Sequence, residues 1–112
     1  MSWTAFDAEK SIGTQGSEGG TIVVDLKHEQ GARITIEQDC LTGPFAITCG
    51  IYGWCVHTCF FSTFDGAEST CLEMQIKLDA ILKLIPMKTD PECDAKTDKV
   101  IDAISEFVAT YP

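Results

Sequence analysis

The sequence has few basic residues. Eight lysines and arginines stand against 17 aspartates and glutamates, so the 112-residue chain carries a formal net charge of −9. A surface of that sign repels phosphate backbones and anionic membranes, so we expect neither nucleic acid nor membrane as a partner. The charge suits a basic partner or a cation, and it also serves solubility alone.

The sequence also lacks a long apolar run and a signal peptide. Its start, MSWTAFDAEKSIG, has no basic end, apolar stretch or small-residue cleavage site. No segment approaches the roughly 20 apolar residues of a membrane span. We therefore expect a cytoplasmic protein whose six cysteines are reduced thiols. None of them forms a C-x-x-C pair, and a secreted disulfide scaffold is the disfavoured alternative.

The length and the 45% apolar content predict a single domain over residues 1–112 whose core needs no metal, disulfide or cofactor. Residues 1–12 fit either a short capped helix or an edge strand. Residues 13–20, GTQGSEGG, form a glycine-rich loop. This loop lacks the Gly-Lys-Ser/Thr of a phosphate-binding loop, and a strand follows it, so we interpret it as a connector or a lid.

Residues 21–64 are predicted to form an antiparallel sheet of two hairpins, because apolar and polar residues alternate with a period of two. To place the apolar residues of the first hairpin on one face, the loop must contain three residues, 29–31. This loop pairs Leu26 with Ile34 and puts Gly31 where a left-handed residue is needed.

The second hairpin is predicted to turn at two residues, Tyr52-Gly53. That turn pairs Ile51 with Trp54 and Cys49 with Val56, and it directs Trp54, Val56 and Phe60 into the core. Tyrosine is uncommon at the first position of such a turn, because both turn residues then need a positive φ.

Residues 65–112 are predicted to form two helices. The first has Asp65 as N-cap with Glu68 as its capping partner and ends at Pro86. The second has Asp90 as N-cap and Pro91 at the first helical position. We therefore predict an α+β two-layer sandwich, with a four-stranded antiparallel sheet and both helices on one of its faces. The apolar stripes are Cys71, Met74, Leu78, Ile81, Leu82 and Ile85 in the first helix and Val100, Ile101, Ile104, Phe107, Val108 and Tyr111 in the second.

Cys55, His57 and Cys59 alternate along one predicted strand. Residues two apart on a strand are separated by about 6.7 Å and residues four apart by about 13 Å. A zinc ion needs its ligands within about 2.3 Å, so a regular strand cannot supply both thiols to one ion, and a Cys55–Cys59 disulfide fails for the same reason. Thiol catalysis would need His57 as a base within hydrogen-bond reach, which this spacing does not favour. We therefore predict no metal or catalytic residue here, and we interpret the face, which includes Phe61, as buried or as an interface.

Three classes of function compete. The first, which we favour, is a non-enzymatic interaction or regulatory module that forms a homodimer or binds another protein through the face of Cys55, His57, Cys59 and Phe61. The second is an acidic inhibitor or immunity-type protein that neutralises a basic partner. The third is a small-ligand binder or enzyme with a pocket between the glycine loop and His57, in which Arg33 anchors an anion.

Overall fold

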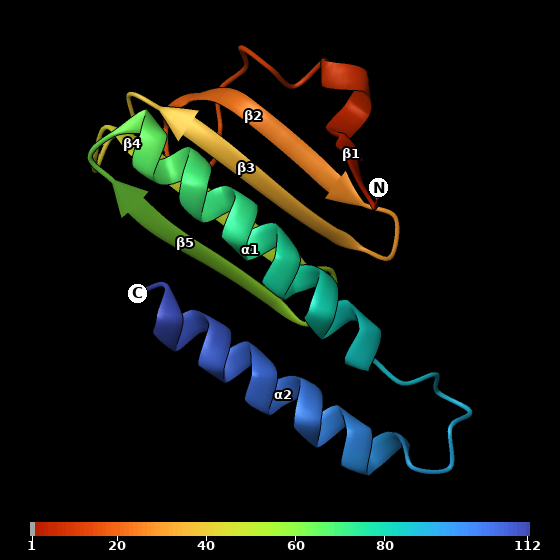
Figure 1. Cartoon of the computed structure of the whole chain (residues 1–112). Coiled ribbons are helices and arrows are strands. Elements are labelled where there is room, and N and C mark those ends of the chain that lie inside the picture. The colour runs from red at the N-terminus through yellow and green to blue at the C-terminus, as the bar shows by residue number, and fades with distance from the viewer. Residues whose placement is uncertain (1) are drawn as a thin grey trace.

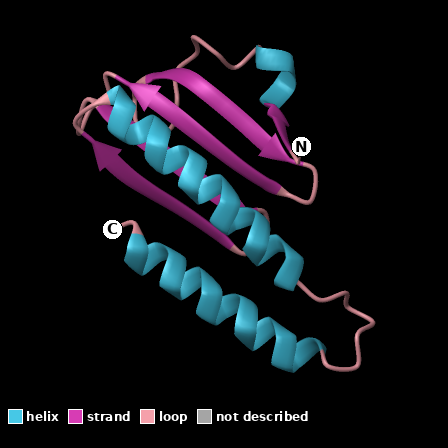
Figure 2. Cartoon of the chain, in the orientation of Figure 1, coloured by secondary structure: helices cyan, strands magenta, loops and turns pink. Residues whose placement is uncertain are grey.

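The computed structural model describes residues 2–112, which form a five-stranded antiparallel sheet with two helices packed on one face (Figure 1). The predicted α+β two-layer class is confirmed, with one strand more than the four expected. The elements are coloured by type in Figure 2. In chain order they are β1 (Trp3–Ala5), β2 (Thr21–His28), β3 (Ala32–Gln38), β4 (Phe45–Ile51), β5 (Cys55–Phe61), α1 (Phe64–Leu84) and α2 (Cys93–Thr110).

The additional strand comes from the N-terminal residues, for which the sequence left strand and helix open. β1 pairs antiparallel with β2 as an edge strand, and the Trp3 indole N–H donates to the Gln75 carbonyl at 3.2 Å. A single turn, Phe6–Glu9, follows it, and its residues Asp7, Ala8 and Glu9 all have positive φ. The edge-strand alternative is therefore realised, and in place of a capped right-handed helix the chain forms a single turn with positive φ and no side-chain cap.

The first hairpin has the predicted register. Leu26 pairs with Ile34, and Gly31 closes the three-residue loop with φ +106°. Nearer its start, β2 carries a bulge between Ile22 and Val24, so Ile22 pairs with Glu37. The bulge turns Ile22 from the helix-covered face to the opposite face, which the period-two pattern did not indicate.

The second hairpin differs from the prediction by one residue. Ile51 pairs with Cys55 rather than Trp54, because Trp54 joins the loop and donates its N–H to the Ile51 carbonyl at 2.9 Å. Gly53 has φ +82°, whereas Tyr52 keeps a negative φ. This is the pattern of a type II turn, which needs a positive φ only at its second central residue.

This shift moves every β5 side chain to the other face of the sheet. Cys55, His57, Cys59 and Phe61 now lie on the side that carries the helices, together with Ile47, which pairs with Cys59. The prediction that Val56 and Phe60 join the core is therefore wrong. They lie on the opposite face, where their side chains are 81% and 42% exposed.

α1 buries most of its predicted stripe, whereas α2 buries Val100 and Phe107 but leaves Ile101 and Val108 exposed, and both helices begin elsewhere than predicted. Thr63, not Asp65, caps α1, since its Oγ1 accepts the Gly66 N–H at 3.1 Å. Asp90 lies before α2 and accepts the Glu92 N–H at 2.8 Å, and the helix itself begins at Cys93. α1 packs on β3, β4 and β5, whereas α2 lies beside α1 and beyond β5 (Figure 1). The most deeply buried apolar side chains of the core are Ile34, Ile36, Ile47, Met74, Leu78 and Val100.

Within residues 2–112, neither helix combines the length and apolar composition needed to cross a bilayer.

Candidate functional site

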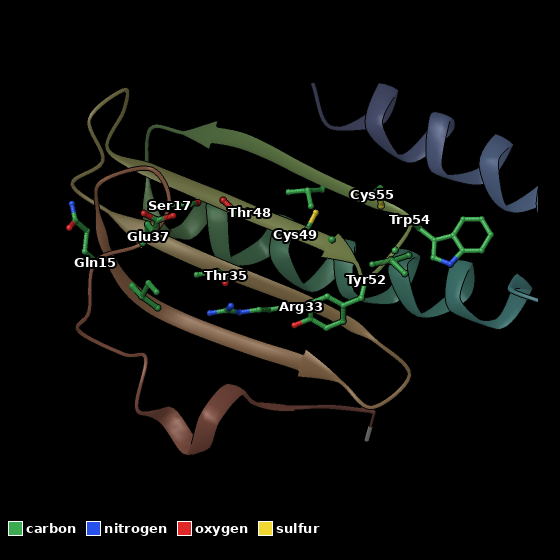
Figure 3. A pocket seen from close by; sticks show the side chains of 16 residues that line it. Gln15, Ser17, Arg33, Thr35, Glu37, Thr48, Cys49, Tyr52, Trp54 and Cys55 are labelled. Carbon is green, nitrogen blue, oxygen red and sulfur yellow. The ribbon is translucent and has the colours of Figure 1, made fainter.

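A groove of about 610 Å³ lies on the face of the sheet opposite the helices (Figure 3). The segment Gln15–Ser17 borders one end of the groove, and the β4–β5 turn, Tyr52–Trp54, borders the other. Its lining is mainly apolar, with a few polar side chains such as Arg33 and Thr48. This size and composition are typical of binding sites in proteins.

An ion pair between the buried Asp25 and the partly exposed Arg33 lies on this face. The Arg33 guanidinium donates two hydrogen bonds to the Asp25 carboxylate, at 2.9 and 2.6 Å, and Thr35 Oγ1 donates a third at 3.0 Å. Burial opposes ionisation of Asp25, but the bonds from Arg33 and Thr35 outweigh it and hold the pKa of Asp25 below 3.8. The Phe6 ring covers the guanidinium at 3.6 Å. The charge of Arg33, which the sequence suggested as an anion anchor, is thus matched by Asp25 of the same chain.

The glycine-rich loop covers a second buried carboxylate, that of Glu37. One Glu37 oxygen accepts the backbone N–H groups of Glu18 and Gly20, at 3.1 and 3.2 Å, and the side chain is fully buried. Gly16 lies so close that a Cβ there would be 2.2 Å from the Glu37 carboxyl carbon. The backbone N–H groups of the loop therefore hold an anion that the chain itself supplies, and the loop is fastened to the sheet.

The residues proposed as an interface divide between the two faces. Arg33 lies on the groove side of the sheet, whereas Cys55, His57, Cys59 and Phe61 lie on the helix side, with Cys55 also bordering the groove beside the β4–β5 turn. The His57 ring bonds through Nε2 to the carbonyl of Tyr111 at the end of α2. The four β5 residues of the predicted set thus share the helix-covered face, and Arg33 is separated from them by the sheet.

The thiols of the core are poor nucleophiles. Burial raises the pKa of Cys49 to about 12 and that of Cys59 to about 11, and burial also raises the pKa of Cys71. Cys59 is 4% exposed, so it packs as a small apolar side chain. Within residues 2–112 the cysteines form no disulfide, and no three histidine, cysteine or carboxylate side chains are grouped as a metal site would require.

His28 is held by both of its ring nitrogens. Its Nδ1 accepts the Gln30 N–H at 3.0 Å, so Nε2 carries the proton and donates to Asp79 at 2.7 Å. The Trp3 ring packs edge-on against it at 5.1 Å. These contacts give His28 a structural role, in which it connects the first hairpin to α1.

The sequence did not place Phe6, Asp25, Glu37 and Tyr52 together in this site. One signal was present, because the correctly predicted register places Asp25 opposite Thr35 and therefore diagonal to Arg33. The position of Glu37 under the loop had no such signal, since it depends on how residues 13–20 fold back over the sheet.

Comparison with known proteins gave no match to a family model, to a curated protein or to a solved structure. The function is therefore argued from the geometry alone.

Proposed function

We propose that the protein is a non-enzymatic interaction module of the cytoplasm that binds a protein partner in the open-face groove and associates with a second copy of itself. The observation that carries the proposal concerns the open face, which is the face of the sheet opposite the helices. The chain itself covers one half of this face and leaves the other half accessible. The N-terminal segment covers the β2–β3 half through Phe6 and the glycine loop. The β4–β5 half carries the groove and leaves Tyr52 and Val56, 65% and 81% exposed, at its rim.

A protein segment suits this surface better than an ionic metabolite. The two charged side chains that line the groove, Arg33 and Glu37, already have partners in Asp25 and in backbone N–H groups. The remaining surface of the groove is mainly apolar, with hydroxyl groups such as that of Thr48. Such a surface can bind a partner's segment through an apolar side chain and hydrogen bonds to the segment's backbone. His57 faces the other side of the sheet, so a groove enzyme that uses it as a base loses its support.

A variant that changes the rim of the groove tests the proposal. Tyr52→Asp places a charge at the exposed rim, and Leu72→Asp, on a residue that is 60% exposed on α1, is the matched control. Each protein is immobilised, and the proteins retained from an extract of the producing cells are compared by mass spectrometry. We expect a partner that wild type and Leu72→Asp retain and Tyr52→Asp loses by about tenfold or more. Equal retention of the partner by all three proteins contradicts the proposal. If native mass spectrometry finds a small molecule bound to wild type and not to Tyr52→Asp, the groove is a metabolite site instead.

One observation favours the acidic-inhibitor alternative as a second candidate. Four exposed acidic residues recur at every fourth position of α2 and form one continuous stripe. Like charges at this spacing repel each other, and a basic partner relieves that repulsion. An interaction through the stripe weakens when the salt concentration rises from about 50 mM to about 500 mM, because the charges are exposed, whereas apolar binding in the groove does not weaken. The residues are Asp94, Asp98, Asp102 and Glu106.

A further inference from the structure

We infer that two copies of the chain pair through their β5 strands, antiparallel and edge to edge, so that the two sheets become one continuous sheet. The inference rests on the self-association in the proposed function, and it names the surface and the register through which it occurs. It involves the edge of the sheet and not the groove.

The free edge of β5 has none of the features that prevent strand addition. Its seven residues, CVHTCFF, include no lysine, carboxylate, proline or glycine, and its pairing with β4 continues without a bulge. In residues 2–112, no hydrogen bond from any element other than β4 reaches the main chain of β5. A long, uncharged edge of this kind is a template for another strand.

The opposite edge of the sheet is protected. β1 has only three residues, and beyond it the first part of β2 is covered by the chain itself. Gly13 donates its N–H to the Ile22 carbonyl at 2.8 Å, and the Ile22 N–H donates to Thr14 at 2.9 Å. Strand addition is therefore directed to β5.

α2 provides a roof for a strand added at β5. The helix lies in the helix layer but past β5, where the described sheet has no strand beneath it (Figure 1). Phe107 packs on His57 of β5, and Ile104 packs against the core. Following the right-handed turn of α2 from Phe107 past Ile104, the next apolar positions are Val108 and Ile101, which are 37% and 50% exposed and continue the apolar face of the helix beyond the part that packs on His57.

The sequence of β5 is complementary to itself about Thr58. If a two-fold axis passes through Thr58, each large side chain of one copy lies opposite a smaller one of the other. Val56 then faces Phe60, an aromatic–β-branched pair of the kind that stabilises antiparallel strands. No like charges meet, because the strand has no residue with a permanent charge. The remaining pairs, listed by their positions, are 55 with 61 and 57 with 59.

The same features favour a second copy over an unrelated strand. In a two-fold contact, each β5 strand pairs with the β5 strand of the other copy. Assembly stops at the dimer, because the far edge of each sheet is covered. Each α2 then covers the partner's strand in the same way, so both exposed apolar pairs, Ile101 and Val108, become buried together.

The test exploits the axis at Thr58. Thr58→Lys and Thr58→Glu each place two like charges opposite each other in the dimer, and mixing them places opposite charges there. By sedimentation or light scattering at about 100 µM, we expect a wild-type dimer, a dissociation constant raised about tenfold or more in each variant, and a dimer restored in the mixture. Leu72→Lys, on the outside of α1, is the control and stays dimeric. A wild-type monomer overturns the inference, and so does a wild-type dimer that neither variant weakens.

Two further measurements keep the test decisive. Circular dichroism establishes that the variants fold, and Ile101→Lys, which leaves β5 intact, weakens the dimer if α2 is the roof. The groove is tested separately by the Tyr52→Asp capture. If Thr58→Lys becomes monomeric and still retains the groove partner, both conclusions stand. If wild type is monomeric and binds the partner, the β5 pairing and the proposed self-association fail, and binding in the groove stands.

Discussion

At the scale of single residues, the buried cysteines decide what the core can do chemically. A thiol must lose its proton to act as a nucleophile. The pKa of Cys49, about 12, and that of Cys59, about 11, keep both protonated at neutral pH. The Cys-His-Cys alternation that stands out in the sequence is therefore mainly a matter of packing.

A thiol-labelling experiment checks this conclusion. With a chromogenic disulfide reagent at pH 8, we expect the half-exposed Cys55 and Cys93 to react first and the buried Cys49, Cys59 and Cys71 to react only on unfolding. In guanidinium chloride all six should react. Six thiols that react rapidly in the native protein would contradict the buried packing of the three cysteines.

The ion pair of Asp25 gives a prediction with a defined pH dependence. The folded pKa of Asp25 lies below 3.8, so the carboxylate stabilises the fold above that pH, and this stabilisation is lost as the pH falls through the folded pKa. Asp25→Asn should lower the free energy of unfolding by about 1–3 kcal/mol at pH 7, because Arg33 and Thr35 lose a charged acceptor.

The difference between Asp25→Asn and wild type should then shrink as the pH falls below about 4, because the unfolded chain takes up the proton first and the folded carboxylate follows at its lower pKa. Urea unfolding at pH 7 and at pH 3 measures it. Asp102→Asn, on the exposed face of α2, is the control and should change stability by about 0.5 kcal/mol at most. A deficit of the same size at both pH values would contradict the role assigned to the carboxylate.

At the scale of elements, the sequence predicted the existence of strands and helices better than their ends. The period-two and period-3.6 patterns extend over many residues, so they identify β2 to β5, α1 and α2. Ends depend on single contacts. The first hairpin was predicted correctly because burial and Gly31 both required three loop residues.

The second hairpin was predicted wrongly because the pattern of β5 admits two registers. Both Val56 with Phe60 and Cys55 with Cys59 form apolar sets, so burial does not choose between them. The choice falls to Tyr52, which avoids a positive φ and thereby lengthens the loop by one residue. That single turn therefore determines which β5 side chains face the groove and which face the helices.

The start of α1 provides a prediction at this scale. Thr63→Ala should cost about 1 kcal/mol of unfolding free energy, because the Gly66 N–H loses its acceptor. Asp65→Ala, at the residue that the sequence suggested as the cap, should cost less, about 0.3–0.5 kcal/mol from its interaction with the helix dipole. Chemical denaturation of both variants compares the two positions. A larger loss for Asp65→Ala would mean that the helix begins where the sequence indicated.

At the scale of the whole molecule, the C-terminal residues fasten α2 to the rest. The Tyr111 hydroxyl donates to Glu73 of α1 at 2.5 Å, its carbonyl meets His57 of β5, and its ring packs on Phe107 at 5.0 Å. α2 rests on α1 and makes few contacts with the sheet, so these bonds carry much of its attachment.

Removing the Tyr111 side chain should therefore loosen α2 selectively. In Tyr111→Ala we expect hydrogen exchange of the α2 amides to accelerate about tenfold or more, while the amides of β3 and α1 change much less. Tyr52→Ala, an exposed tyrosine in a turn, is the control and should leave α2 unchanged. Equal acceleration throughout the chain would show that α2 opens only when the whole fold does.

The strand order β1-β2-β3-β4-β5, in which every strand pairs with its neighbour in sequence, has a consequence during synthesis on the ribosome. Each hairpin can close as soon as its second strand has emerged, since no pairing waits for a distant segment. The helices that cover Ile34, Ile36 and Ile47 come last. The nascent sheet is thus complete while one face is still bare, and translation speed through residues 64–110 sets how long that face is open to neighbouring nascent chains.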